Sequence, residues 1–249
     1  DFEDIHSLQN ALNGVEEVYH CAAKVSFHPK DEKKMYQTNI EGTKQLLFAC
    51  QNSSVKKFLF VSSIAVLDGL NENGELDESS DFNPKIDHSA YAISKHFSEM
   101  EVWRASAEGL NTVIVNPGLI IGSGNWKESS GTLFMEFEKN DYTFSGGTSY
   151  VDVRDVAQIS IELMEKNIFG ERFILVSESA KYEEIGNSIR QKLGKSPMKL
   201  LPNVVLKVGF YLNLLFGWLF SPLKMANKVN IKSVTEFNKI SNKKIKEKL

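Results

Sequence analysis

Apolar residues follow two alternating patterns along this chain: short continuous runs, and longer stretches in which they recur every three or four positions. The runs 57–63 and 111–118 have continuous apolar centres, at 58–61 and 113–115, bounded by polar residues, which is typical of strands buried on both faces of a parallel sheet. Two similar runs, at 15–23 and 172–177, complete the predicted strands. The recurring stretches predict helices within residues 1–13, 31–51, 89–109, 133–139, 154–166 and 182–193.

Strands and helices alternate through much of the chain, and this order predicts an α/β fold with a doubly wound parallel sheet. We expect residues 1–120 and 151–177 to form this core. Residues 121–150 and 178–249 are less regular and are predicted to form a smaller, C-terminal α/β region. The polar residues 68–87 are expected to be an exposed excursion.

The composition excludes several classes of protein. Of 249 residues, 42% are hydrophobic and 24% are charged, which is the profile of an ordinary globular domain with a full core. The net charge of −3 gives no electrostatic reason to expect a nucleic-acid partner. The two cysteines, Cys21 and Cys50, lie in apolar surroundings without metal-site spacing, so we expect no metal, and reduced core thiols in a cytoplasmic protein.

One C-terminal stretch, 204–223, is strongly apolar but is interrupted by Lys207 and Asn213. Its longest uncharged part, 208–220, is shorter than the ~20 residues needed to span a bilayer. We expect it to form a helix of the core or of a cap. A contact with a membrane surface is the alternative.

The candidate chemistry begins with Tyr91 and Lys95, which are four positions apart in a predicted helix and therefore project from the same side of it. A free phenol has a pKa of about 10, and a nearby ammonium would favour the phenolate and lower that pKa. Ser63 ends the preceding strand and could bond the same substrate oxygen. The tyrosine and lysine alone make a common surface pair, but a doubly wound sheet binds ligands at the carboxyl ends of its strands, where Ser63 lies.

Seven motifs follow one another along the chain: Asp1-Phe-Glu-Asp4, Tyr19-His-Cys-Ala-Ala23, Asn39-Ile-Glu-Gly-Thr43, Phe60-Val-Ser-Ser63, Tyr91-x-x-x-Lys95, Asn116-Pro-Gly118 with Gly122-Ser-Gly124, and Tyr150-Val-Asp-Val-Arg-Asp-Val-Ala157. In order and spacing they resemble the extended short-chain dehydrogenases/reductases, in the group of NAD-dependent epimerases/dehydratases and dihydroflavonol-4-reductase-like proteins. The resemblance covers nearly the whole chain. It implies a Rossmann-like, dinucleotide-binding core and a substrate-binding cap.

The resemblance also implies roles for single residues. Tyr91 would give or take the proton at the substrate oxygen, Lys95 would lower the pKa of Tyr91 and hold the nicotinamide ribose, and Ser63 would bond the reacting oxygen. Asn39 would take part in a water-mediated relay. The implied cofactor is NAD or NADP, bound by Asp1, Phe2, Cys21, Ala22, Ala23, Val61, Tyr91, Lys95, Pro117, Gly118, Leu119 and Ile120. The implied substrate contacts are Lys24, Ser26, Ser63 and Asn116.

The chain departs from the family pattern at its beginning. The family opens with a Gly-x-x-Gly-x-x-Gly turn that places the cofactor pyrophosphate on a helix N-terminus, and none of the 16 glycines here has this spacing. The residue that would choose between NAD and NADP is missing with it. We therefore expect a fragment that lacks about 60 to 70 N-terminal residues, a length judged from the size of a βα unit, and that is inactive by itself.

We expect the protein to interconvert a ketone and a secondary alcohol of a small-molecule substrate, with a homodimer as one oligomeric option. A nucleotide-sugar epimerase that uses the same three residues is the first alternative, and a non-catalytic dinucleotide sensor is the second. Dehydration is disfavoured because Ile64 and Ala65 stand where dehydratases of the family carry an Asp-Glu pair. The substrate stays open because the loops at 122–147 have no interpretable pattern of charge.

Overall fold

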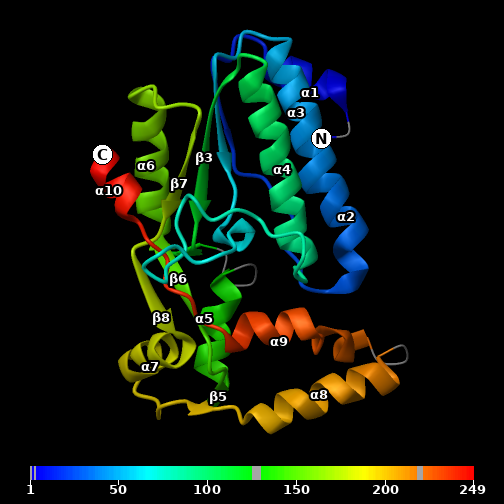
Figure 1. Ribbon diagram of the computed structural model, residues 1–249, viewed down its shortest axis with the longest axis vertical. Coiled ribbons are helices and arrows are strands. Elements are labelled where there is room, and N and C mark those ends of the chain that lie inside the picture. Colours follow the sequence, from blue (N-terminus) through cyan, green and yellow to red (C-terminus); the bar gives the residue numbers. More distant parts are fainter. Residues whose placement is uncertain (1, 3, 125–129, 218–220) are drawn as a thin grey trace.

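The computed structural model, which describes residues 2, 4–124, 130–217 and 221–249, has a parallel sheet of four strands at its centre (Figure 1). The strands are β1 (Glu17–His20), β2 (Lys57–Val61), β3 (Asn111–Pro117) and β7 (Glu171–Leu175). They lie in the order β1-β2-β3-β7, and every neighbouring pair is parallel. The carboxyl ends of the strands therefore face the same edge of the sheet.

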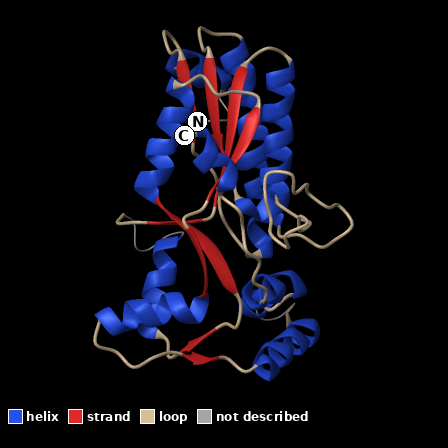
Figure 2. Cartoon of the chain, turned by 60° about the vertical axis from the view of Figure 1, so that its left-hand side comes forward, coloured by secondary structure: helices blue, strands red, loops and turns tan. Residues whose placement is uncertain are grey.

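Helices cover both faces of this sheet (Figure 2). They are α1 (Ile5–Ala11), α3 (Gly42–Gln51) and α4 (Ala90–Ala107) on one face, and α6 (Val153–Glu165) and α10 (Lys243–Lys248) on the other. Side chains of β2 alternate between the two layers: Phe58 and Phe60 pack with the first group, and Leu59 packs with the second. The predicted doubly wound α/β fold is confirmed.

A smaller group of elements lies beyond the carboxyl ends of the strands, at the lower end of the molecule in Figure 1. These elements are β4 (Leu119–Ile121), α5 (Ser130–Lys139), β5 (Tyr142–Thr143), β6 (Gly147–Asp152), β8 (Glu178–Lys181), α7 (Tyr182–Lys192), β9 (Lys199–Leu200), α8 (Asn203–Phe216) and α9 (Lys228–Thr235). One small sheet has the order β4-β6-β8, and β5 pairs with β9 in another. Residues 125–129 of the predicted loops lie outside the described residues. The division of the chain into two regions stays a prediction.

Capping residues explain where two helices begin and end. The side chain of Asp4 accepts hydrogen bonds from two backbone N–H groups in the first turn of α1. The Ser89 hydroxyl accepts a hydrogen bond from the Ala92 N–H at 3.1 Å and so starts α4. Gly109 follows the end of α4 with a φ of +103°, a conformation that glycine adopts without strain.

The predicted helix at 31–51 is interrupted. It consists of α2 (Glu32–Tyr36), a π-helical turn (Gln37–Glu41) and α3. A π turn holds one residue more than an α turn, and such turns are frequent at functional sites. The buried side chain of Asn39 lies in this turn, where it bonds groups outside the helix.

Two parts of the chain are more exposed than expected. Residues 204–223 were expected to form a helix of the core or of a cap; α8 has no buried residue and lies at the outer end of the molecule, so the core helix is wrong and the cap helix stays a prediction. Cys21 is exposed and only Cys50 is a core thiol, because β1 ends at His20 and the residues after it leave the sheet. Among the described residues, no helix is long and apolar enough to cross a membrane.

The excursion at 68–87 forms a loop that is tied to a distant part of the chain. Its Leu76 makes an isolated bridge with Ile240. The Leu76 N–H donates to the Lys239 carbonyl at 3.0 Å, and the Ser241 N–H donates to the Leu76 carbonyl at 2.8 Å. The loop is therefore held by the segment that leads into α10.

Candidate active site

Ser63 and Tyr91 meet at the carboxyl end of β2. Ser63 follows this strand and caps the 3₁₀ turn Ile64–Val66, where its hydroxyl accepts a hydrogen bond from the Ala65 N–H at 3.2 Å. Tyr91 is the second residue of α4 and is half-buried. The Ser63 side chain is near enough to the Tyr91 phenol to lower its pKa. A strand end and a helix start thus bring two hydroxyl groups together.

The protonation of Tyr91 depends on its surroundings. Burial raises the pKa of Tyr91 above its ordinary value, and the Ser63 side chain acts in the opposite direction. The expectation that Lys95 lowers this pKa stays a prediction. In this structure the Lys95 ammonium donates a hydrogen bond to the Val61 carbonyl.

Lys95 is only 3% exposed. Its Nζ donates a hydrogen bond to the Val61 carbonyl at 2.7 Å and lies 4.6 Å from the centroid of the Phe60 ring. Burial lowers the pKa of Lys95 to about 8, although the nearby Glu99 acts against this change. The site therefore contains a buried ammonium that loses its proton at a far lower pH than an exposed lysine.

Replacing Lys95 by Met is expected to stabilise the protein at neutral pH. Because the unfolded state binds the lysine proton more tightly, keeping Lys95 protonated in the fold costs about 3 kcal/mol below pH 8. This cost disappears as the pH rises from about 8 to 10.5. We expect the free energy of unfolding of the variant to exceed that of the native protein by roughly 2 kcal/mol at pH 7, after loss of the Val61 hydrogen bond. The gain should vanish near pH 10.

Urea unfolding of both proteins at pH 7 and at about pH 10 measures this difference. The exposed Lys34 offers a matched control, and Lys34→Met should change the free energy of unfolding equally at both pH values. A Lys95→Met variant that is no more stable than the native protein at pH 7 would contradict the assigned cost of burial. So would a gain that is the same at both pH values.

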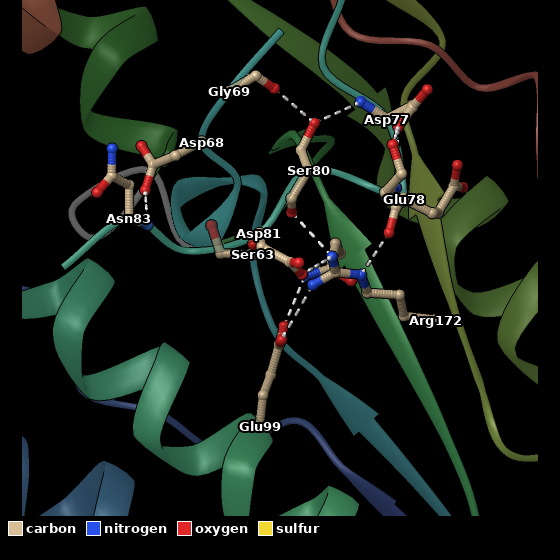
Figure 3. A network of polar contacts seen from close by, with 12 residues as sticks. Ser63, Asp68, Gly69, Asp77, Glu78, Ser80, Asp81, Asn83, Glu99 and Arg172 are labelled. Carbon is tan, nitrogen blue, oxygen red and sulfur yellow. Dashed lines mark hydrogen bonds and ion pairs between the residues drawn. The ribbon is translucent and has the colours of Figure 1, made fainter. Parts of the chain in front are cut away.

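A buried polar network is hydrogen-bonded to the backbone carbonyl of Ser63. Asn116 is fully buried in β3, and its Nδ2 donates hydrogen bonds to the Ser63 carbonyl at 3.1 Å and to Glu99 Oε1 at 2.7 Å. Glu99 Oε2 lies 3.7 Å from the guanidinium of Arg172 on β7 (Figure 3). Burial raises the pKa of Glu99, whereas its hydrogen bond with Asn116 and the charge of Arg172 favour the carboxylate. The network joins α4, β3 and β7 to the backbone of Ser63.

Arg172 also holds the exposed loop 68–87 against the sheet. Its Nε donates to the Glu78 carbonyl at 2.9 Å, and its Nη2 donates to the Ser80 carbonyl at 2.8 Å (Figure 3). The carboxylate of Asp81 lies 3.3 Å from the same Nη2. One guanidinium therefore connects the loop with Glu99, whose carboxylate lies on its other side.

Neither Glu99 nor Arg172 was predicted as a site residue. Two signals in the sequence point to them: a carboxylate four positions after Lys95, on the same side of the helix, and a lone cation next to an apolar strand run. Asn116, which was predicted to contact the substrate, has its amide hydrogens bonded to protein groups. Its contact with a substrate stays a prediction.

Asn39 connects the segment after β1 with α4. Its Oδ1 accepts a hydrogen bond from the Lys24 N–H at 2.7 Å, and its Nδ2 donates to the Lys24 carbonyl at 2.9 Å. The same Nδ2 donates to the hydroxyl of Ser94, which precedes Lys95 on α4, at 2.9 Å. The π turn thus places an amide that fixes the backbone beside the candidate site. The water-mediated relay stays a prediction.

Most of the predicted cofactor contacts lie along one edge of the sheet. Cys21 interacts electrostatically with Lys95 and is followed by two more exposed small residues. The edge comprises Cys21, Ala22 and Ala23 after β1, Val61 at the end of β2, and Pro117, Gly118, Leu119 and Ile120 where β3 passes into β4. Packing alone requires glycine at position 118, because a Cβ there would collide with the Ser149 carbonyl of β6.

The remaining cofactor predictions fall elsewhere. The ring of Phe2 meets the ring of His20 edge-on, with 5.5 Å between the centroids, and packs against Gly42 at the start of α3. It belongs to the apolar layer between α3 and the sheet. Asp1 lies outside the described residues.

The predicted substrate contacts Lys24 and Ser26 both approach one carboxylate. The Ser26 hydroxyl donates to Asp31 at 2.7 Å, and Lys24 Nζ lies 3.9 Å from the same carboxylate. The hydrogen bond with Ser26 is the main cause that lowers the pKa of Asp31. These three side chains form a polar cluster on the segment after β1, and the two substrate contacts stay predictions.

The chain is similar to known proteins over most of its length. Residues 1–175 match the model of the NAD dependent epimerase/dehydratase family. Sterol demethylase protein B of Methylococcus capsulatus is 30% identical over 188 residues, which cover 74% of this chain and 57% of that protein. Anthocyanidin reductase of Arabidopsis thaliana is 30% identical over 219 residues, which cover 78% of this chain and 64% of that protein. The chain thus spans less than two thirds of either relative.

Two solved structures show the same fold. The crystal structure of gox2253 superposes with a TM-score of 0.83 at 26% identity, and covers 100% of this chain and 77% of its own. UDP-glucose 4-epimerase of Thermotoga maritima, solved with UDP-glucose, has a TM-score of 0.76 at 20% identity, with 99% of this chain and 75% of its own covered. With the family match over residues 1–175 and the doubly wound parallel sheet, the chain belongs to the NAD-dependent epimerase/dehydratase family, among the extended short-chain dehydrogenases/reductases.

Proposed function

We propose that the protein carrying this chain is an NAD(P)-dependent oxidoreductase that interconverts a ketone and a secondary alcohol of a small molecule. The observation that carries the proposal is the convergence of three side chains at the carboxyl end of β2. The Ser63 side chain acts on the Tyr91 phenol, and the buried Lys95 ammonium lies one helical turn after Tyr91, against Val61. Doubly wound sheets bind their ligands at this edge.

Each of the three residues has a distinct task in this proposal. Tyr91 gives a proton to the substrate oxygen in reduction and takes it back in oxidation. Ser63 donates a hydrogen bond to the same oxygen and stabilises the negative charge that develops there. Lys95 contributes a fixed positive charge within the buried site. The bound nicotinamide supplies or accepts the hydride.

The residues present fit one end of a nicotinamide dinucleotide. An ammonium has three N–H groups, and the described contacts of Lys95 use one of them on the Val61 carbonyl, which leaves donors for ribose hydroxyls. The exposed Cys21, Ala22 and Ala23 leave room for a flat ligand beside that ammonium. For the pyrophosphate end, the given sequence has no glycine triplet. We therefore assign the nicotinamide ribose to Lys95 and leave the choice between NAD and NADP open.

A nucleotide-sugar epimerase is the second candidate, because it would use the same three groups for a transient oxidation. The relatives favour the reductase: anthocyanidin reductase is 30% identical to the chain, whereas the epimerase from Thermotoga maritima is 20% identical. The two reactions differ in what they consume. A reductase oxidises one reduced cofactor for each product formed, and an epimerase has no net demand for the cofactor.

Replacing Ser63 by Ala tests the proposal. We expect turnover to fall by about 10²-fold, because one donor to the developing oxyanion is lost. The measurement is the rate of NADH or NADPH oxidation by the whole protein with a panel of small ketones.

Ser62 is the matched control, since it is the adjacent serine and is buried behind the strand end. Ser62→Ala should keep turnover within about twofold of the native rate, the range expected when no hydrogen bond to the reacting oxygen is removed. A larger loss in Ser62→Ala than in Ser63→Ala would refute the assignment of Ser63. Turnover of a nucleotide sugar without net oxidation of the cofactor would favour the epimerase.

A further inference from the structure

α8 exposes large apolar side chains to solvent along one whole face. Val204, Val208, Tyr211 and Leu212 are 68%, 51%, 62% and 40% exposed. Their spacing, at i, i+4, i+7 and i+8, places them on one side of the helix. Isolated apolar residues on a surface are ordinary, but a continuous apolar face marks a site of interaction.

The opposite face of α8 holds the helix on the protein. Asn213 Nδ2 donates to the Ala226 carbonyl at 3.4 Å, and Gly209 lies against the Ala226 side chain. Leu206 and Phe210, on this same side, are partly buried. The exposed apolar face is therefore fixed outward. Figure 1 shows α8 as the outermost helix at its end of the molecule, beyond α9.

The chain around α8 is strongly basic. Residues 185–235 contain eight lysines and arginines and no aspartate or glutamate, although the whole chain has a net charge of −3. Four of these cations, Arg190, Lys195, Lys228 and Lys232, pair with carboxylates outside this stretch. Lys207 lies on α8 itself and Lys199 lies just before it, and both are exposed. Among the described residues, neither of these two lysines forms an ion pair. The apolar face is thus flanked by positive charge.

This charge distinguishes between the two obvious occupants of the face. A second copy of the chain would bring the same basic region against itself, and like charges at close range oppose association. An anionic lipid surface attracts lysines and accepts apolar side chains at the level of its headgroups and acyl chains. The observations therefore favour the lipid surface.

We propose that α8 is an interfacial helix that binds the protein to the surface of an anionic phospholipid bilayer. The helix lies in the plane of the membrane, with Val204, Val208, Tyr211 and Leu212 inserted and Lys199 and Lys207 at the headgroups. Its 14 residues make a rod of about 21 Å, which is shorter than the ~30 Å hydrocarbon layer, so the contact is one-sided. The proposal does not depend on the chemistry assigned to Ser63 and Tyr91.

Flotation of the whole protein with phospholipid vesicles tests the proposal. The native protein should bind vesicles of phosphatidylcholine with about one third phosphatidylglycerol, bind pure phosphatidylcholine vesicles less well, and lose affinity at high salt. The double variant Val208→Asp, Tyr211→Asp should lower the lipid partition coefficient by at least about tenfold, because it places charge on the inserted face. Both side chains are exposed, so the fold should be retained, and circular dichroism checks this.

Phe48 provides the matched control, because it is 55% exposed on α3, away from α8. Phe48→Asp should bind vesicles as well as the native protein does. The proposal is overturned if the native protein binds neither kind of vesicle, or if it binds both equally well at any salt concentration. It is also overturned if sedimentation equilibrium shows a native dimer that the double variant dissociates while vesicles bind neither protein, since the face would then join two copies.

Discussion

Replacing Tyr91 by Phe in the whole protein should lower turnover by about 10³-fold, because the variant keeps the ring but has no proton to exchange with the substrate oxygen. Cofactor affinity should stay nearly unchanged, since the Lys95 ammonium is held by the Val61 carbonyl and does not depend on the phenol. A large effect on turnover with a small effect on binding separates a proton donor from a residue that only shapes the site.

Steady-state rates with a reduced cofactor and a small ketone measure the first effect, and fluorescence titration of the cofactor measures the second. Tyr142→Phe is the control, because Tyr142 is 53% exposed on β5. It should keep the native rate. A Tyr91→Phe variant with native turnover would rule out the assignment of Tyr91 as the proton donor.

Replacing Arg172 by Met should lower the free energy of unfolding by about 3 to 5 kcal/mol. The substitution keeps most of the side-chain length but leaves the Glu99 carboxylate buried without its nearest cation. It also removes the donors to the Glu78 and Ser80 carbonyls, which hold the loop 68–87. Because burial already raises the pKa of Glu99, the loss of Arg172 should raise that pKa further and make the carboxyl group take up a proton in the fold.

Urea unfolding at pH 7 and at pH 5 measures both effects, since protonation of Glu99 should make the variant relatively less unstable at the lower pH. Arg154→Met is the matched control. Arg154 pairs with Asp152 at the surface, with 86% of its side chain exposed, and its loss should cost less than about 1 kcal/mol. Equal costs for the two arginine variants would show that the buried pair with Glu99 adds nothing to stability.

The sheet and its helices were predictable because each depends on local patterns. The run Phe58–Phe60 is continuously apolar, so both faces of its strand have to be buried. In the structure its side chains pack against the helices on both sides of the sheet. Asp4 and Ser89 are capping residues whose effect is confined to a single turn. The short strands β4, β8 and β9 had no such signal. They are only two to four residues long, and pairing with distant partners rather than their own pattern makes them strands.

The candidate site was predictable only in part, for a related reason. The spacing of Tyr91 and Lys95 and the strand end at Ser63 are visible in the sequence, and their family order adds to the signal. Glu99 and Arg172 lie on different elements, and only the folded sheet brings them within 3.7 Å of each other. The pKa of Tyr91 depends on burial and on the neighbouring Ser63, and neither can be derived from spacing. An exposed apolar face on α8 was expected only as the alternative, because an apolar helix in a sequence carries no sign of what will cover it.

Because Leu76 forms a bridge with Ile240, the loop around Leu76 can take up its final position only after residue 240 has been synthesised. The strands β1, β2 and β3 and the helices between them are all made before residue 120, so this part of the core can begin to assemble while the chain is still growing. The loop around Leu76 has to wait, because its partners Lys239 and Ser241 leave the ribosome much later. The loop 68–87 beside the candidate site is therefore among the last parts of the chain to take up its final position.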